Sequence, residues 1–289
     1  MEQIIFQGRI GDIEVERVDR NVEFTMDSKH FHNQYEIYYL VEGERYYFID
    51  KETYLVKKGG LVFVDRNQIH KTGPAKEAYH DRVLISFSGE EIESFSNTNY
   101  NINIENFFKR HNGVLEFNED GQKHVENLIF KIMDEMQKRM TGYEFVIKAR
   151  LVELIIFAIR CIKGENATRK TNTAQTEKHK KVHEIAEFIN ENYQKQISLT
   201  QISEDFYISK SYLSRIFKEV TGFTVHEYLN IVRIKKAQYL LENTDISITS
   251  VAEKVGYDSI TYFERVFKKY FEIAPLRYRK KYQQPKIIG

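Results

Sequence analysis

Cysteine is nearly absent from this chain of 289 residues, which contains only Cys161. One thiol cannot form an intramolecular disulfide or a cysteine-based zinc site. Long apolar runs are also absent: the longest uncharged one, Leu154 to Ile159, is far shorter than the ~20 residues of a membrane-spanning helix. Met1 to Ile4 shows no basic segment followed by an apolar one, so no secretory signal is predicted there. We expect a cytoplasmic protein without a membrane span.

Catalytic signatures are lacking as well. The sequence shows no Ser/His/Asp arrangement, no nucleotide-binding glycine loop and no reactive cysteine, because Cys161 lies in an apolar stretch where an inert core thiol is expected. We therefore predict a protein that is not an enzyme and that needs no cofactor.

Charge is distributed unevenly along the chain. With 42% hydrophobic and 29% charged residues, the composition is that of a globular protein. Residues 1–177 carry 24 Lys and Arg against 29 Asp and Glu, a net charge of −5, whereas residues 178–289 carry 19 against 13, a net charge of +6. A basic C-terminal part is typical of a module that binds a polyanion, although random drift could produce so small an excess.

Short β-prone segments fill the N-terminal part of the chain. They are rich in Ile, Val, Tyr and Phe and are separated by turn residues such as Glu42-Gly43 and Lys58-Gly59-Gly60. Strands are predicted at residues 4–10, 13–18, 35–41, 44–50, 52–56, 60–64 and 79–88. Closely spaced strands of this kind favour a sandwich or a small barrel.

Helical periodicity replaces the strands after about residue 120. Apolar residues from Val125 to Met140 recur at helical spacing, and a second helix is predicted from Tyr143 to Lys163. Its segment from Leu151 to Ile159 is apolar around most of its circumference. This predicts two packing partners, the β-domain and either a second subunit or other parts of the same chain. The polar stretch from Gly164 to Lys178 is interpreted as a linker.

The C-terminal part contains an internal repeat. Ser198–Glu204 (SLTQISE) aligns with Ser247–Glu253 (SITSVAE) at an offset of 49 residues, and Leu213–Lys218 (LSRIFK) aligns with Phe263–Lys268 (FERVFK) at an offset of 50. Each copy predicts a short helix, a tight turn and a second helix. This is the helix-turn-helix unit, whose second helix lies in the major groove of DNA.

Capping residues and one long helix complete this unit. Ser209 and Asp258 are the expected N-caps of the second helix in each copy, and Ser198 with Gln201 fits a capping box. Thr224 to Asn243 is predicted as a single helix of about 20 residues, a rod of ~30 Å. This length is close to the ~34 Å between equivalent groove positions, so one chain could place two reading helices in successive major grooves. A plain helical bundle is the alternative.

Several motifs of the repeat occur in a familiar order over about 100 residues. They are Ser209–Lys218 with Thr221-Gly222, Ala252–Asp258 followed by Tyr262-Phe263 and Arg265–Lys269, and Pro275 with Tyr278-Arg279. In these motifs the chain resembles the AraC/XylS family of bacterial transcription regulators. Ser203 departs from the usual Ala, and Glu272 stands where Gly is common. The resemblance implies a sequence-specific DNA-binding domain.

The resemblance also assigns ten DNA-binding residues. Base-reading positions are Ser211, Ser214 and Arg215 in the first helix and Thr261, Glu264 and Arg265 in the second; Lys210, Lys218, Lys268 and Lys269 are expected on phosphates. Arg can donate two hydrogen bonds to guanine, and an acidic side chain can accept from the amino group of cytosine. Phosphate contacts set affinity and salt dependence rather than sequence choice. The repeated Phe217 and Phe267 are predicted core residues.

A second motif lies among the predicted strands. His30 and His32 are followed by Glu36 and then by Gly43, and His70 lies ten residues after Gly60. This pattern resembles the cupin superfamily of small barrels, although Arg66-Asn67 stands where Pro and Gly are expected. In an extended strand the side chains at 30, 32, 36 and 38 face one way. We predict that His30, His32, Glu36, Tyr38 and His70 converge on a ligand inside a barrel.

Two uses of these residues are open. Three imidazoles and a carboxylate suit Fe, Mn, Ni or Zn, but the same groups can hydrogen-bond a polar effector. The effector is favoured, and no metal is predicted. His80, His111 and His124 have no evident partners in the sequence and are expected at the surface.

The predicted fold class is a multidomain α+β chain. It has a cupin-like effector-binding barrel at 1–120, a helical dimerisation region at 121–163, a linker at 164–178 and an all-α double helix-turn-helix domain at 179–285. The predicted function is regulation of transcription, gated by a small polar effector; a sugar is the family's commonest one. The expected partners are double-stranded DNA and a second copy of the chain, with RNA polymerase as a further candidate. The rival interpretations are a cupin metalloenzyme or metal sensor with a DNA-targeting tail, and a constitutive DNA binder with an inactive barrel.

Overall fold

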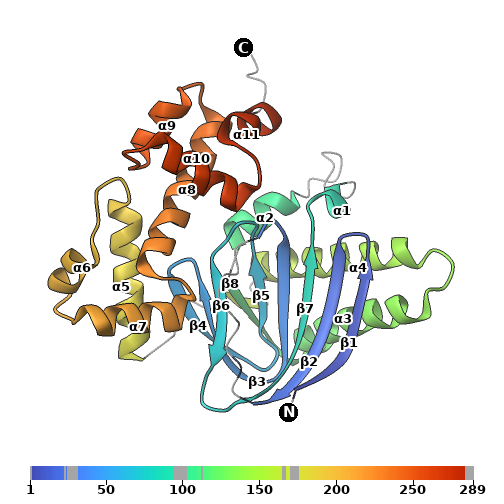
Figure 1. The fold of residues 1–289 in the computed structure, drawn as a ribbon. Coiled ribbons are helices and arrows are strands. Elements are labelled where there is room, and N and C mark those ends of the chain that lie inside the picture. Colours follow the sequence, from blue (N-terminus) through green and yellow to red (C-terminus); the bar gives the residue numbers. More distant parts are fainter. Residues whose placement is uncertain are drawn as a thin grey trace. The chain divides into compact units, whose positions relative to one another are not determined.

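The computed structural model describes residues 2–22, 24, 32–93, 103–111, 113–164, 167–169 and 176–283. The chain divides into two compact units, the second of which comprises residues 176–283 of the described part. The first unit combines a β-domain with helices, and the second is helical (Figure 1). This is the predicted α+β class with a separate all-α domain. Within the described residues, no helix combines the length and apolarity that a membrane span requires.

The β-domain is antiparallel throughout the described residues. Its strands are β1 (Glu2–Ile10), β2 (Ile13–Asn21), β3 (Tyr35–Ile49), β4 (Glu52–Lys57), β5 (Leu61–Val64), β6 (His70–Pro74), β7 (Tyr79–Phe87), β8 (Gly113–Phe117) and β9 (Ala167–Arg169). They pair in the order β1-β2-β7-β3-β5-β8-β9, and β4 and β6 also pair with β3.

Strand β3 holds the domain together. Its first half pairs with β5 and β7, and its second half pairs with β4 and β6. A register shift between Leu40 and Glu42 and the left-handed Gly43 (φ 94°) lie where the pairing changes. A Cβ at Gly43 would come within 2.5 Å of the Tyr79 carbonyl oxygen, so only glycine fits this close approach. The two predicted strands 35–41 and 44–50 are therefore one bent strand.

The two faces of β3 contribute to different clusters. Ile37 and Tyr39 face the helices, whereas Tyr38, Leu40 and Tyr47 lie in a second cluster inside the β-domain. This alternation is the consequence of the two-residue period of a strand. The remaining predicted strands are all present, while β6, β8 and β9 were not predicted. β9 lies inside the predicted linker 164–178, where it pairs with β8.

Four helices accompany the β-domain in the described part. They are α1 (Glu90–Glu93), α2 (Ile104–His111), α3 (Glu119–Lys138) and α4 (Tyr143–Lys163). The α3 helix starts at the N-cap Asn118, whose side chain accepts from the Gly121 amide, and ends at Arg139 in the left-handed region. Helices α3 and α4 therefore match the two that periodicity predicts, and α1 and α2 were not predicted.

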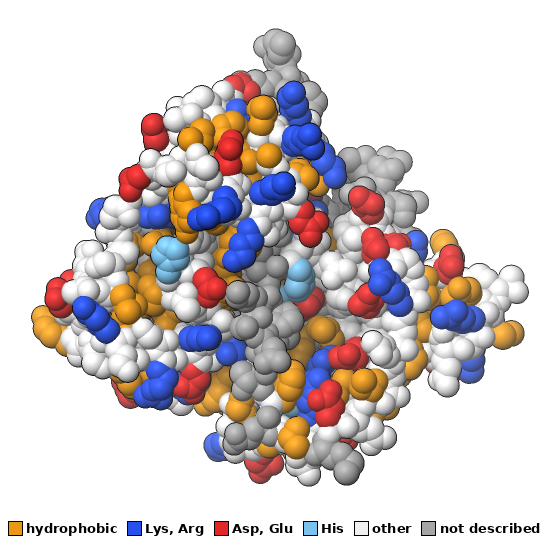
Figure 2. All heavy atoms as spheres, viewed as in Figure 1, with side chains coloured by type: hydrophobic (Ala, Val, Ile, Leu, Met, Phe, Trp, Pro, Cys, Tyr) orange, Lys and Arg blue, Asp and Glu red, His pale blue; other side chains and the backbone are white. Residues whose placement is uncertain are grey.

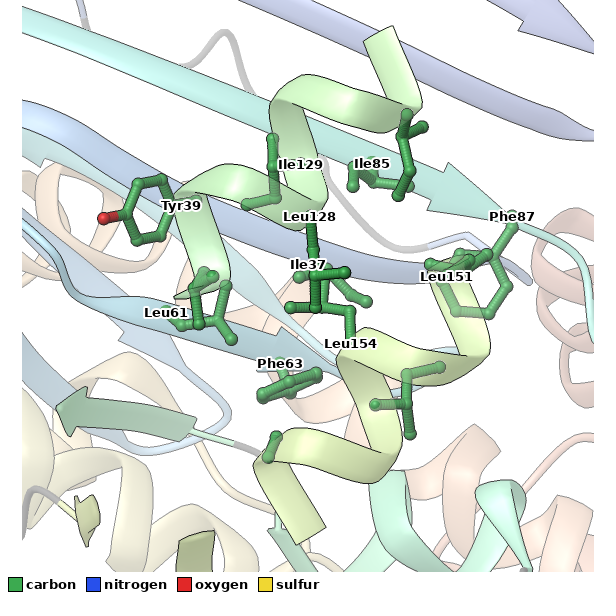
Figure 3. Close-up of a cluster of buried hydrophobic side chains, with 14 of the residues drawn as sticks. Ile37, Tyr39, Leu61, Phe63, Ile85, Phe87, Leu128, Ile129, Leu151 and Leu154 are labelled. Atoms are coloured by element: carbon green, nitrogen blue, oxygen red, sulfur yellow. The ribbon is translucent and has the colours of Figure 1, made fainter. Parts of the chain in front are cut away.

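Helices α3 and α4 pack on the outer face of the β-domain (Figures 1 and 3). Figure 3 shows Leu128 and Ile129 of α3 and Leu151 and Leu154 of α4 against strand residues such as Phe63. Replacing one such fully buried leucine by alanine typically costs about 2–5 kcal/mol. Cys161 is buried in the same core, as predicted. Ile156 and Phe157 of α4 also pack against this core but are only half-buried, so part of the apolar circumference is left without a complete cover in the described structure.

The second unit consists of helices. They are α5 (Glu177–Asn192), α6 (Leu199–Asp205), α7 (Lys210–Thr221), α8 (Val225–Asn243), α9 (Ile248–Lys254), α10 (Ile260–Phe271) and α11 (Pro275–Tyr282). Phe217 and Phe267 are fully buried, as predicted. The predicted long helix corresponds to α8, which begins with a reciprocal capping box between Thr224 and Glu227.

Candidate functional sites

The second unit contains two helix-turn-helix copies, α6–α7 and α9–α10. In each turn one residue has a positive φ, Tyr207 (52°) in the first copy and Gly256 (90°) in the second. Ser209 caps α7 as predicted, but α10 is capped by Ser259, so the prediction of Asp258 is wrong. The residue inserted in the second copy therefore lies between Gly256 and its cap, which makes that turn one residue longer.

Helices α7 and α10 bury matching faces. Leu213, Ile216 and Phe217 are buried in α7, and Phe263, Val266 and Phe267 occupy the same places in α10, 50 residues later. The opposite faces are exposed. They carry all ten predicted DNA-binding residues: Lys210, Ser211, Ser214, Arg215, Lys218, Thr261, Glu264, Arg265, Lys268 and Lys269.

The two candidate reading arginines have the same local support. The Arg215 guanidinium lies 5.2 Å from the ring centroid of Tyr212, and that of Arg265 lies 5.1 Å from Tyr262. Arg215 also lies 3.9 Å from Glu219, an exposed contact of little energetic value. A tyrosine one turn earlier thus limits the positions of each arginine while leaving it exposed. The sequence analysis gave these two rings no role, although Tyr212 and Tyr262 repeat at the same offset of 50 residues.

A buried polar network holds the middle of α8. The Arg233 Nε donates to the Tyr193 carbonyl and its Nη2 donates to the Lys195 carbonyl, both at 2.8 Å. Burial lowers the pKa of Arg233. Asn230 accepts from the Tyr257 hydroxyl at 3.0 Å, which ties α8 to the second helix-turn-helix copy. An arginine between apolar neighbours, in Ile231-Val232-Arg233-Ile234, is the signal that could have revealed this network.

Positive charge is most visible on the α8, α10 and α11 side of this unit. Figure 2 shows Lys and Arg side chains gathered over the helices that Figure 1 labels α8, α10 and α11. The short helix α11 alone contributes Arg277, Arg279, Lys280 and Lys281. Such a surface attracts the phosphate backbone of DNA.

In the β-domain, three of the five predicted ligand-binding residues form one cluster. Glu36 Oε1 lies 3.0 Å from His32 Nε2, and Glu36 Oε2 lies 3.1 Å from His70 Nε2. His32 precedes β3 and is not in an extended strand, so the predicted common strand face does not explain its position. His70 comes from β6, which was not predicted. His30 lies outside the described residues.

This cluster is charged and could hold a cation. Burial alone would raise the pKa of Glu36 and lower that of His70, but their mutual attraction lowers the first and raises the second. One ligand atom from each of His32, Glu36 and His70 lies within 4.8 Å of the others. Two imidazoles and a carboxylate suit zinc or iron, so the donor set fits a metal as well as a polar ligand.

Tyr38 lies deeper in the β-domain, next to Tyr47. Their rings meet at 5.2 Å in a T-shaped arrangement, and both side chains are buried. Neither hydroxyl has a hydrogen-bond partner among the described residues. Burial raises the pKa of both tyrosines, that of Tyr38 to about 12, so both are neutral donors near pH 7. Tyr38 thus faces the interior, as predicted.

Three buried arginines near Tyr38 were missed at the sequence level. Arg20, Arg45 and Arg82 are 6%, 0% and 8% exposed, and each influences the ionisation of both Tyr38 and His80. His80 is only 1% exposed, so its predicted surface position is wrong. His111 and His124 are half-buried beside the rings of Phe107 and Phe157.

Comparison with known proteins assigns both units. A profile of the AraC-like ligand binding domain matches residues 14–139, and a profile of the helix-turn-helix domain matches residues 202–281. The chain belongs to the AraC family of transcriptional regulators. The first match includes most of the β-domain and α3, and the second includes both helix-turn-helix copies. This AraC-family chain is therefore a DNA-binding regulator with a ligand-binding domain.

Its relatives include regulators of similar length. The chain is 24% identical to the Msm operon regulatory protein of Streptococcus mutans over 93% of this chain and 91% of that one. It is 24% identical to the transcriptional activator RhaR of Mannheimia succiniciproducens, over 88% and 87% of the two chains. A lactose operon transcription activator of Staphylococcus xylosus is 35% identical over 98 residues, which are 34% of this chain and 35% of that one.

Proposed function

We propose that this AraC-family chain activates transcription when a small polar effector binds its β-domain. The names of two relatives describe activators, and one of those relatives regulates a lactose operon, so a sugar-derived effector and an activating role are the natural first assignments. Because its target is DNA, we assign the protein to the bacterial cytoplasm. The domain scheme follows: 1–120 senses the effector, 121–163 dimerises, 164–178 links, and 179–285 binds DNA.

The exposed faces of α7 and α10 would read the operator. The observation that supports this is their equivalence: both helices bury the same apolar positions and expose an arginine next to a tyrosine, 50 residues apart. Ser211, Ser214 and Arg215, and Thr261, Glu264 and Arg265, are assigned to base edges. Lys210, Lys218, Lys268 and Lys269 are assigned to phosphates, and their charge would supply affinity that falls with salt.

Effector binding would act by shifting a population. A ligand that binds better to the conformation in which both DNA-binding domains of a dimer fit adjacent sites favours that conformation. Coupling two domains raises their effective concentration on the operator. RNA polymerase, as the target of an activator, is proposed as a third partner. His30, His32, Glu36, Tyr38 and His70 are assigned to the effector.

Replacement of Arg215 by alanine tests the DNA assignment. Loss of an arginine that donates two hydrogen bonds to guanine costs about 1–3 kcal/mol, a weakening of roughly 5- to 150-fold. We expect this loss for a specific operator fragment selected from genomic DNA, and less than about 3-fold for random DNA at the same salt concentration. Fluorescence anisotropy measures both. Lys180→Ala, which removes an exposed cation that is not part of either reading helix, is the matched control. Equal loss on both DNAs would show that Arg215 contacts only phosphate.

A metal-responsive regulator is the second candidate. The observation in its favour is the set of three ligand atoms of His32, Glu36 and His70 within 4.8 Å. Elemental analysis of the purified protein decides between the candidates, because a metal sensor or a metalloenzyme would contain a stoichiometric ion that Glu36→Gln removes.

A further inference from the structure

We propose that the effector carries an oxyanion, a carboxylate or phosphate group, and that Arg20, Arg45 and Arg82 bind this group inside the β-domain. The inference rests on the proposed effector function and names the chemical class of the ligand. It assigns the charge-recognising residues to three side chains outside the His32–Glu36–His70 cluster.

Strand pairing brings the three arginines to the same interior face. Arg20 of β2 pairs with His80 of β7, and Arg82 of β7 pairs with Val18 of β2 and Leu40 of β3. Val18 and Arg20, and His80 and Arg82, are separated by two residues, so the side chains of each pair share a face. Leu40 belongs to the interior cluster of the β-domain. Arg45 follows on the second half of β3, beyond the register shift, and is fully buried.

Each guanidinium uses only one of its nitrogens within the described structure. The Nη2 atoms donate to Glu2 Oε1 at 3.1 Å from Arg20, to the Phe24 carbonyl at 2.6 Å from Arg45, and to Glu16 Oε1 at 2.5 Å from Arg82. Five other buried nitrogens find no acceptor among the described residues: Nε and Nη1 of Arg20, Nε and Nη1 of Arg45, and Nη1 of Arg82. Arg45 has no carboxylate partner in this part of the chain.

A neighbouring arginine of this domain, in contrast, has a carboxylate partner that accepts from two of its nitrogens. Arg17 donates to both carboxylate oxygens of Asp81, at 3.1 Å from Nε and 2.6 Å from Nη2. Both carboxylate oxygens of Asp81 therefore already accept from Arg17, and Asp81 is not the counter-charge of the three buried arginines. Glu2 and Glu16 are 44% and 32% exposed, so they lie at the rim and leave the buried ends of Arg20 and Arg82 unmatched.

The charge of the cluster is not balanced internally. Burial, with repulsion from Arg20 and Arg82, lowers the pKa of Arg45 to about 10, which still leaves it a cation at neutral pH. Burial and the same arginines lower the pKa of His80 to about 4, so that imidazole stays neutral. A buried cation without a counter-charge destabilises a fold. A carboxylate or phosphate, which arginine binds through charge-assisted hydrogen bonds, would remove that cost.

Hydroxyl groups beside the arginines would bind the rest of such a molecule. The hydroxyls of Tyr38 and Tyr47, which belong to the interior cluster, are buried and without partners among the described residues. A sugar acid, a sugar phosphate or another hydroxylated carboxylate would match both the cations and the hydroxyls. A neutral sugar would satisfy the hydroxyls and leave the guanidinium charge unmatched.

Thermal unfolding of the full-length protein tests the inference. Sodium phosphate and sodium citrate are compared with sodium chloride at equal ionic strength, for wild type, Arg45→Met and the control Arg9→Met, which alters an exposed arginine of β1. We expect either oxyanion to raise the Tm of wild type and Arg9→Met several degrees more than that of Arg45→Met, with an apparent affinity at least 10-fold weaker in Arg45→Met. A larger rise in Tm with phosphate than with citrate indicates a phosphoryl site, and a larger rise with citrate indicates a carboxylate site. Arg45→Met in chloride should unfold no earlier than wild type; Arg20→Met is the second variant if Arg45→Met does not fold.

Equal responses of wild type and both interior variants to both anions would overturn the inference, as would an Arg45→Met protein that unfolds earlier in chloride but keeps the full anion response. A neutral sugar that stabilises wild type and Arg45→Met equally and changes DNA affinity would also overturn it, while leaving the proposed effector function intact. Loss of sequence-specific DNA binding in Arg215→Ala is measured separately, so the DNA assignment stands or fails independently.

Discussion

His80 occupies an environment that resists protonation. It is buried beside three arginines, and its Nδ1 donates to the Ala78 carbonyl at 3.1 Å. Burial and the positive charge of Arg45 lower its pKa from 6.5 to about 4. The unfolded chain therefore binds a proton in a range where the folded chain does not.

A loss of stability in mild acid follows from this residue. The contribution of His80 is fully present above about pH 6.5 and is lost as the pH falls to 4, by roughly 3 kcal/mol at most. We expect His80→Asn, whose amide can replace the Nδ1 donor, to flatten the unfolding free energy of the β-domain between pH 6.5 and 4. Urea unfolding at several pH values measures this. An unchanged slope in His80→Asn would contradict the assigned pKa.

Buried charges were the residues that local sequence signals could not reveal. Glu36 and Tyr38 were predicted because they lie in a recognisable motif. Arg20, Arg45 and Arg82 each stand beside other polar residues, as in Asp19-Arg20-Asn21, Glu44-Arg45 and His80-Asp81-Arg82, and such runs are typical of exposed positions. Only the pairing of β2, β7 and β3 turns those positions inward, and pairing is a long-range property of the chain.

The two turns of the helix-turn-helix copies differ in what they tolerate. Tyr207 has a positive φ but is 96% exposed, so its side chain meets nothing. A Cβ at Gly256 would lie 2.7 Å from the Gln194 carbonyl oxygen and 3.0 Å from Arg233 Nη2. The turn position with a positive φ therefore tolerates a side chain in the first copy but requires glycine in the second.

Matched substitutions would show this asymmetry. We expect Gly256→Ala to destabilise the helical unit by about 2–4 kcal/mol, because backbone strain and a steric conflict add. Tyr207→Gly should change the unfolding free energy by less than about 1 kcal/mol, since relief of strain opposes added chain entropy. Urea unfolding followed by circular dichroism gives both values. A Gly256→Ala protein as stable as wild type would show that the second turn is not packed as described.

Helices with strong apolar periodicity were predictable, whereas a strand without a local pattern and the exact cap of one helix were not. The α3, α4 and α8 helices follow from apolar spacing and lie close to their predicted bounds. β6 was missed because Lys71, Thr72 and Gly73 give no β-prone pattern; the strand exists because β3 supplies its partner. The α10 cap was assigned one residue too early because two alignments with offsets of 49 and 50 do not say where the extra residue lies.

At the scale of the whole molecule, α3 and α4 present a candidate contact surface. A groove of about 470 Å³ is lined by residues of these helices, among them His124, Val152, Ile156, Phe157 and Arg160. Ile156 and Phe157 are half-buried, although they lie in the most apolar stretch of the chain. A second copy of the chain would cover them.

A substitution in this surface tests the proposed dimer. We expect Phe157→Glu to weaken dimerisation at least 10-fold in analytical ultracentrifugation, because burial of a carboxylate in an apolar interface is costly. Operator affinity should fall with it, while affinity for random DNA stays near that of wild type. Lys138→Glu, which places a glutamate at an exposed position of α3, is the control. A Phe157→Glu protein that remains dimeric would assign the interface to other residues.

Helix α8 joins the two DNA-binding copies through its own backbone and through Asn230 and Arg233, which are buried at its middle. Such a connection is rigid, and it fixes the distance and the angle between the two copies. Each base pair inserted between two recognition segments rotates them by about a tenth of a turn around the duplex axis. A rigid connection cannot follow that rotation, so we expect the affinity of this regulator for DNA to depend on the spacing between the two recognition segments.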